Sequence, residues 1–164
     1  MALVDFFLKI EGIPGEATDS KHKDEIDVLS WSWGATQTGS HSYGSGGGAG
    51  KVSMQDFHFV KKVDKSSHAL MLHCANGSHI KSALLTCRKA GGSQQEYLKI
   101  TLSDLLVSSF QTSGSQGSEV VPTEQFSLNF SQITYQYAPQ KADGTLAGYV
   151  KSGWNLKENK AASA

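Results

Sequence analysis

The sequence has 164 residues, which is long enough for one domain with a substantial hydrophobic core. Its 15 basic and 15 acidic residues give a formal net charge of +0, so charge does not favour nucleic acid or an anionic membrane as a partner. No apolar run approaches the length of a membrane-spanning helix. We therefore expect a single domain over 1–164 that binds no nucleic acid and does not insert into a membrane.

The first ten residues, MALVDFFLKI, lack the basic start, the long apolar centre and the small-residue cleavage site of a secretory signal. We therefore expect a protein that starts in the cytoplasm and, if it is secreted, leaves without a cleaved signal peptide. Cys74 and Cys87 are the only cysteines, and they form no CxxC pair. In a reducing compartment two free thiols are expected rather than a disulfide.

Most of the chain has the pattern of β-strands. Seven segments combine alternating polarity with β-branched and aromatic residues, and each is bounded by turn-forming residues. They are 3–10, 26–33, 52–63, 80–88, 97–111, 124–137 and 148–156. This pattern predicts a mainly β fold.

The segment 65–77 has a helical pattern instead. Ser66 or Ser67 can cap its first turn, and Gly77 can end its last turn. Three of its apolar residues, Leu70, Met71 and Cys74, fall on one face at helical spacing. One short helix among many strands indicates an antiparallel barrel or sandwich with the helix packed beside it.

Two of the predicted strands change the parity of their apolar residues partway. In 26–33 these residues are even-numbered up to Val28 and odd-numbered from Leu29 onward. In 124–137 the change comes between Phe130 and Ile133. Such a change indicates a β-bulge or a strand that turns over. Alternatively, both faces of the strand are partly buried, one in the core and one against a neighbouring subunit.

The stretch 26–33 also separates large from small side chains. Trp31 and Trp33 share one face, and we expect them to anchor the core. Ser30 and Ser32 take the opposite face, which is small, polar and uncharged. Exposed strands usually carry Lys, Glu or Thr, so this bare surface suggests that another molecule passes close to it.

The stretch YGSGGGAGKV, at 43–52, has some features of a phosphate-binding loop. Counting back from Gly50 leads to Ser45 where that motif has Gly, and Val52 stands where it has Ser or Thr. A strand pattern follows rather than the helix that such a loop opens. We therefore expect no nucleotide site, and interpret 34–51 as an extended glycine-rich loop.

The sequence also lacks recognisable catalytic motifs. Its six histidines form no HExxH and no paired Cys/His zinc pattern, and there is no GxSxG elbow. We expect no catalytic residues, no metal site and no cofactor.

Seven motifs along the chain are similar to those of one known family. They are SWSWG at 30–34, GGGAGKV at 46–52, RKAGG at 88–92, EYLKITL at 96–102, LVSSF at 106–110, QKADG at 140–144 and GWNL at 153–156. Together they resemble the haemolysin-coregulated protein family, Hcp, which forms the tube of the bacterial type VI secretion system. The resemblance implies an antiparallel β-barrel of two sheets with one short flanking α-helix.

The resemblance also implies an assembly and its partners. Six copies would form a ring with a wide channel, and rings would stack into a tube that carries a spike protein and is enclosed by a contractile sheath. Small effector proteins would ride inside the ring, which would protect them as a chaperone does, and the tube would be fired out of the bacterial cytoplasm. The position of Ser32 would face the channel, with Ser30 beside it. The glycine-rich loop would contact the next ring through His41, Tyr43, Gly44, Gly46, Gly47, Gly48 and Gly50.

Two other functions remain open at this point. A monomeric β-barrel that binds a small ligand would have an apolar interior cavity and would not form rings. A hydrolase on a β scaffold would need a convergent Ser/His/Asp or metal site.

Overall fold

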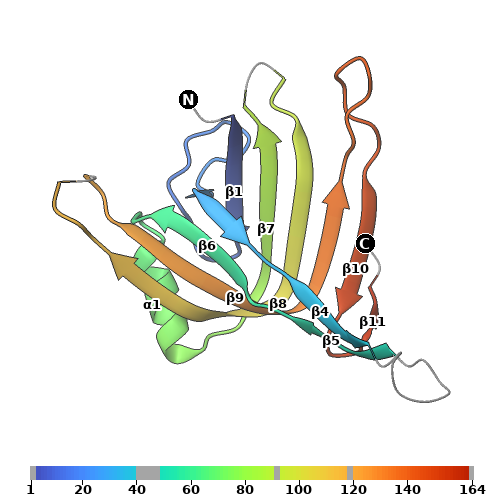
Figure 1. The fold of residues 1–164 in the computed structure, drawn as a ribbon. Helices are drawn as coiled ribbons and strands as arrows, with labels where there is room; N and C mark the ends of the chain where they lie inside the picture. The colour runs from blue at the N-terminus through green and yellow to red at the C-terminus, as the bar shows by residue number, and fades with distance from the viewer. Residues whose placement is uncertain (1–2, 40–48, 91–92, 118–119, 163–164) are drawn as a thin grey trace.

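The computed structural model describes residues 3–39, 49–90, 93–117 and 120–162 (Figure 1). Its elements are, in chain order, β1 (Val4–Ile10), β2 (Ile26–Val28), β3 (Ser30–Ser32), β4 (Ala35–Gly39), β5 (Ala49–Met54), β6 (Phe57–Lys62), α1 (Ser67–Asn76), β7 (Ile80–Lys89), β8 (Glu96–Ser113), β9 (Thr123–Tyr137), β10 (Val150–Asn155) and β11 (Lys160–Ala161). The predicted mainly β fold with one short helix is confirmed within these ranges.

Nine of the strands form one antiparallel sheet with the order β11-β10-β9-β8-β7-β1-β2, to which β6 adds through β9 and β3 through β6. The long strands β8 and β9 bend sharply, so the sheet folds into two layers that face each other (Figure 1). The first layer contains β2, β1, β7, the beginning of β8, the end of β9, β10 and β11. The second contains the end of β8, the beginning of β9, β6 and β3. The result is barrel-like, although the ladder of strand pairs does not close into a ring.

Both long strands change layer at the same level. Leu102 pairs with Ile133 on one side of the bend, and Leu105 pairs with Phe130 on the other. Between them Asp104 has a left-handed backbone with φ 53°. All four paired side chains are buried, so the parity of the buried residues shifts here in both strands. The parity change in 124–137 therefore marks a strand that passes from one layer to the other.

The segment 26–33 changes layer as well, and the prediction of one continuous strand is wrong. It divides into β2, which pairs with β1, and β3, which pairs with β6. Leu29 lies between the two strands with its side chain exposed, and its backbone N–H donates to the carbonyl oxygen of Val60 at 2.8 Å. This is where the two layers meet on the side of the barrel away from β8 and β9.

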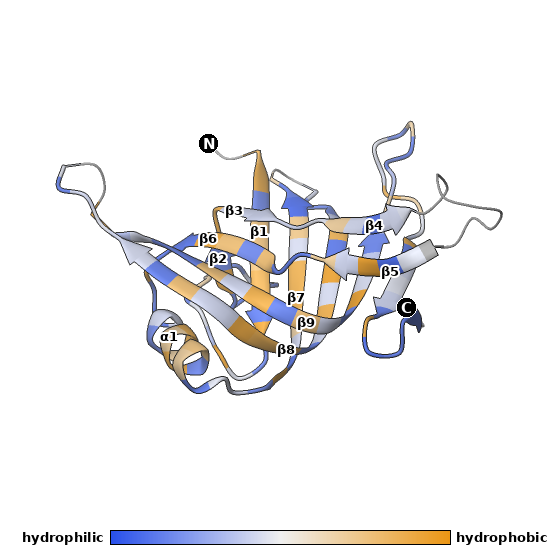
Figure 2. Ribbon diagram, turned by 60° about the horizontal axis from the view of Figure 1, so that its bottom comes forward, coloured by the Kyte–Doolittle hydropathy of each residue, from blue (hydrophilic) through white to orange (hydrophobic). Residues whose placement is uncertain are grey.

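The predicted loop over 34–51 is wrong at both ends. β4 and β5 pair with each other, for example Gln37 with Val52, and form a separate two-stranded sheet. Thr36, Thr38 and Val52 favour strands, which explains why the loop is shorter than predicted. The hairpin projects beyond the barrel at one end of the molecule (Figures 1 and 2). Residues 40–48 lie outside the described part of the chain.

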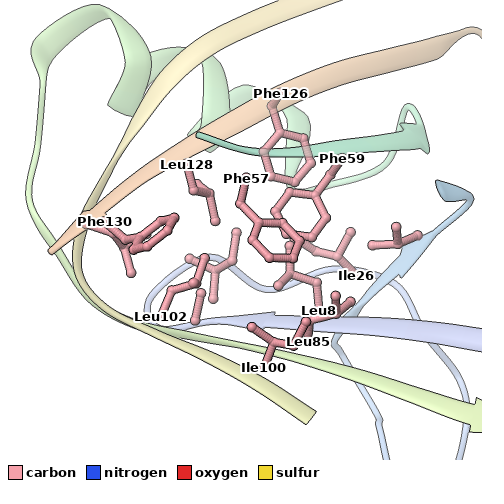
Figure 3. Packing of buried hydrophobic residues seen from close by; sticks show 14 of the residues in the cluster. Leu8, Ile26, Phe57, Phe59, Leu85, Ile100, Leu102, Phe126, Leu128 and Phe130 are labelled. Carbon is pink, nitrogen blue, oxygen red and sulfur yellow. The ribbon is translucent and has the colours of Figure 1, made fainter. Parts of the chain in front are cut away.

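The core lies between the two layers. Phe57, Phe59 and Phe126 of the second layer form a stack with ring centroids 5.0 and 5.1 Å apart, and they face Leu8 and Leu85 of the first (Figure 3). Along the strands, hydrophobic residues alternate with hydrophilic ones, as a sheet with one buried face requires (Figure 2).

Helix α1 packs against β8 and contributes to the core. It ends at Gly77, which has φ 65° and donates its N–H to the carbonyl oxygen of His73. Leu70 is fully buried and Cys74 packs against the core. The expectation that Met71 shares this face is wrong, because its side chain is 51% exposed. In the described ranges, no helix combines the length and the apolar character that a membrane span requires.

Candidate functional site

The second layer has one face in the core and one face that points away from it. Strand register places the outward residues in two rows across β3, β6, β9 and β8. The first row is Ser32, His58, Ser127 and Ser109, and the second row is Ser30, Val60, Gln125 and Gln111. We call these eight residues the polar face. The alternate residues along the same strands, such as Trp31 and Phe59, point into the core.

The polar face has no carboxylate, ammonium or guanidinium group, and His58 is its one ionisable member. On this face of the second layer, charged residues occur only beyond the two rows. Along the direction of β6 they are Asp56 before the first row and Lys62 after the second. The outward face of the first layer is different, since its rows carry Lys9, Lys99 and Lys151. The uncharged surface predicted around Ser30 and Ser32 thus extends over four strands.

The centre of the polar face is hollowed. A cavity of about 260 Å³ is lined by Ser30, Ser32, His58 and Gln125, with Trp31, Phe59 and Val60 forming its floor. Ser30, Ser32, His58 and Gln125 are all exposed. No other residue in the described ranges forms a hydrogen bond with these four side chains. Their polar groups are therefore available to a ligand.

The far end of the first row is fixed by its own hydrogen bonds. A bulge in β8 between Val107 and Ser109 brings two serines of that strand beside Ser127 of β9. The hydroxyl of Ser127 lies 2.7 Å from that of Ser108 and 2.5 Å from that of Ser109. The hydroxyl groups in this part of the polar face are consequently more rigid, and less available to a ligand, than those around Ser32.

The two tryptophans opposite the polar face lie at the edge of the core and are half-buried. The ring of Trp31 stacks on that of Phe57 at 5.7 Å and meets Phe6 edge-on at 6.2 Å, and Trp33 stacks on Phe57 at 6.2 Å. Burial raises the pKa of the neighbouring Cys87 thiol to about 12, and a hydrogen bond with Trp31 only partly opposes this rise. Cys87 is therefore a packed core thiol, and it is free, as the sequence suggested.

The residues expected to stack rings lie almost entirely between β4 and β5. His41, Tyr43, Gly44, Gly46, Gly47 and Gly48 lie outside the described residues. Gly50 belongs to β5 rather than to a loop. A Cβ atom at this position would lie 2.6 Å from the carbonyl oxygen of Thr38, so glycine is needed for β4 and β5 to approach each other.

A second surface feature was not identified from the sequence. An apolar cleft of about 410 Å³ separates the hairpin from β9 and β10. Its lining includes Trp33, Val52 and Met54 on one side and Ile133, Tyr135 and Trp154 on the other. The same apolar surface continues through Tyr137 to Val150, which is 62% exposed. We call this whole surface the apolar cleft. The alternation of Tyr135 and Tyr137 was the only signal for it in the sequence.

The buried charged groups elsewhere serve the fold. Both terminal nitrogens of Arg88 donate to the Asp19 carboxylate, at 3.0 and 2.5 Å, and its guanidinium lies 4.8 Å above the ring of Phe7. These hydrogen bonds lower the pKa of Asp19 to about 2. His22 also stacks on the Phe7 ring, at 4.5 Å, and its Nε2 lies 2.7 Å from the carboxylate of Glu96. Across the described part of the chain, no three His, Cys, Asp or Glu side chains cluster as metal ligands.

Comparison with known proteins decides the family. Residues 7–137 match the family model described as "Type VI secretion system effector, Hcp". The chain belongs to the Hcp family. The resemblance found in the sequence motifs is therefore confirmed, and the family links the protein to the type VI secretion system.

Individual Hcp proteins agree with this assignment. Protein hcp1 of Pseudomonas aeruginosa is 53% identical over 158 residues, which cover 95% of this chain and 97% of that protein. The crystal structure of Hcp1 from Salmonella typhimurium has a TM-score of 0.80 at 38% identity and covers 98% of this chain and 100% of its own. A type VI secretion system effector from Yersinia pestis has a TM-score of 0.75 at 33% identity, with coverage of 92% and 99%.

Proposed function

We propose that this Hcp-family chain is a structural subunit of the type VI secretion tube and not an enzyme. Six copies form a ring, the polar face lines its channel, and stacked rings carry small effector proteins out of the bacterial cytoplasm. The observation that supports this proposal most directly is the polar face, which is uncharged over four strands although the first layer carries three lysines on its outward side. A channel that admits and releases different proteins needs such a surface.

Exposed apolar groups support the association of copies. The apolar cleft lies at the hairpin end of the molecule, and Val120 and Val121 are exposed at the opposite end, where β8 turns into β9 (Figure 1). Two different uncovered apolar surfaces at opposite ends fit head-to-tail contacts, which both ring closure and stacking require.

The hairpin supports a role between rings. All five residues of β4 are exposed, and β4 and β5 pair only with each other. A two-stranded hairpin is marginally stable alone, so a partner surface would stabilise it. In our proposal residues 40–48 at its tip, with His41, Tyr43 and the glycines, contact the next ring. The spike protein at the tube tip and the contractile sheath around it are the other partners.

The proposal is tested by the size and shape of the purified protein. Sedimentation should give a hexamer, and negative-stain electron microscopy should show annuli with six-fold symmetry. The second candidate function, a monomeric barrel that binds a small ligand, is favoured by one observation, the apolar cleft with its volume of about 410 Å³. A protein that stays monomeric at micromolar concentration would favour this candidate and contradict the tube subunit.

A further inference from the structure

We infer that His58 is the specificity-determining contact of the polar face and binds a carboxylate group of the cargo protein. Uncharged hydroxyl and amide groups around it complete the site. The inference rests on the proposed function, because it assigns a chemistry to the surface that would line the channel. It goes further in naming the residue and the cargo group that pair there.

The position of His58 is the first observation. It stands in the first row with Ser32 on one side and Ser127 on the other, and its exposed ring lines the 260 Å³ cavity. No described residue forms a hydrogen bond or an ion pair with this ring. The imidazole therefore presents both nitrogens to whatever occupies the cavity, together with the free hydroxyls of Ser30 and Ser32.

The charges around His58 are the second observation. From β3 it meets Ser30 and Ser32, and from β9 it meets Ser127 and Gln125, none of which is ionisable. β8, one strand farther, contributes Ser109 and Gln111 to the rows. On the outward face of its own strand and the turn before it, the charged groups are Lys62, four residues on, and Asp56, which accepts a hydrogen bond from Asn129 at 2.8 Å. Lys61 of the same strand points into the core, where it pairs with Glu124.

These surroundings select the charge of the ligand. A carboxylate in the cavity would find hydroxyl and amide donors and an imidazole that can carry a positive charge, which are the groups that stabilise an anion. A cationic side chain would find no carboxylate in either row.

The test uses two synthetic peptides with a neutral dye, one with a single Glu among Ser and Gly residues and one with Gln in its place. Fluorescence anisotropy measures their binding to the full-length protein. We expect the Glu peptide to bind about threefold more tightly than the Gln peptide, a difference typical of an exposed ion pair.

Two histidine variants make the test specific. His58→Gln should abolish the preference for Glu, whereas His68→Gln, at an exposed histidine of α1, should leave it unchanged. Equal binding of the two peptides to the native rings, or an unchanged preference in the His58→Gln rings, would overturn the inference and leave the proposed ring intact. If the native protein sediments only as a monomer, the proposed function fails, and the inference fails with it.

Discussion

The side chains of Lys61 and Glu124 form an ion pair inside the protein, with 0% and 1% of their surfaces exposed. The two residues face each other across β6 and β9. The ammonium group of Lys61 also donates to Asp64 at 2.9 Å and to Ser67 at 3.2 Å, and the Ser67 hydroxyl donates to Glu124 at 2.5 Å. This network connects the start of α1 to the sheet directly beneath one end of the polar face.

Removing one member of this pair should strongly destabilise the protein. Glu124→Gln leaves the Lys61 ammonium buried without its main counter-charge, which costs about 3–5 kcal/mol of unfolding free energy. Denaturant titration of the variant measures this loss. Glu158→Gln removes an exposed pair with Lys160 and should change stability by no more than about 1 kcal/mol. Similar losses in the two variants would contradict the role of the buried network.

The second prediction concerns acid. Asp19 has a folded pKa of about 2 against an ordinary value of 3.8, because Arg88 hydrogen-bonds to its carboxylate. The folded state therefore binds this proton less readily than the unfolded state does. Its contribution to stability is present in full above pH 3.8 and disappears as the pH falls towards about 2. As the pH falls through this range, the free energy of unfolding should decrease less steeply in Asp19→Asn than in the native protein. Equal slopes in the two proteins would contradict the role of the Asp19–Arg88 pair.

The third prediction concerns the channel. Ser32→Gln places a longer side chain in the 260 Å³ cavity, and because Ser32 is exposed the fold should tolerate it. We expect intact hexamers that retain less co-expressed effector after size-exclusion chromatography. Ser20→Gln, at an exposed loop serine, is the matched control. Unchanged effector in the Ser32→Gln peak, or loss of the folded hexamer, would show that this idea is wrong.

The fourth prediction concerns the apolar cleft. Tyr135→Lys introduces a charge into a surface that we expect a second copy to cover, so assemblies should give way to smaller species in sedimentation. Tyr135→Phe keeps the aromatic side chain, and this variant should assemble normally because no described residue forms a hydrogen bond with the Tyr135 hydroxyl. Tyr135 is 42% exposed, so the lysine can be accommodated in the free chain, and circular dichroism should remain unchanged. Full-sized assemblies of Tyr135→Lys would place the subunit contact elsewhere.

The fifth prediction concerns the hairpin tip. Removing residues 44–48 keeps Gly50 and the pairing of β4 with β5, so single hexamers should still form on a sizing column. Tube formation and secretion should be lost, because the contact with the next ring is missing. If the shortened protein polymerises and is exported normally, the tip is only a spacer. ATP should alter neither assembly nor melting temperature, since the Gly-Lys pair lacks the context of a nucleotide site.

The sequence was sufficient to predict a strand, and the face that each side chain takes, where the evidence is the alternation of residues within one segment. The segment 124–137 was predicted almost to the bounds of β9, and Ser30 and Ser32 were placed opposite the tryptophans by parity alone. The division of 26–33 into β2 and β3 depends instead on two different partner strands, β1 and β6, which lie far apart in the chain. A change in the parity of the apolar residues shows that the strand changes direction or layer there, but it does not identify the partner strands on either side of the change.

The rest of the candidate site could not be predicted for the same reason. His58 and Gln125 join Ser32 and Ser30 only through strand register, which one sequence does not encode locally. The hairpin was missed because ATQTG contains no large apolar residue and is surrounded by glycines and serines, so it has the composition of a loop. The apolar cleft depends on how far the hairpin stands from β10, which no pattern within either segment records.

The bend that β8 and β9 share has a consequence for the order of folding. The two strands are consecutive in the chain, and their pairing runs from one layer into the other. Forming this single hairpin closes only a short loop, yet it creates the template for both layers at once. β7 and β10, the neighbours of this hairpin along the chain, can add to it in the first layer at little further entropic cost. The pairing of β6 with β9 and of β1 with β7 spans longer stretches of chain, so the barrel should be completed last on the side where Leu29 joins its layers.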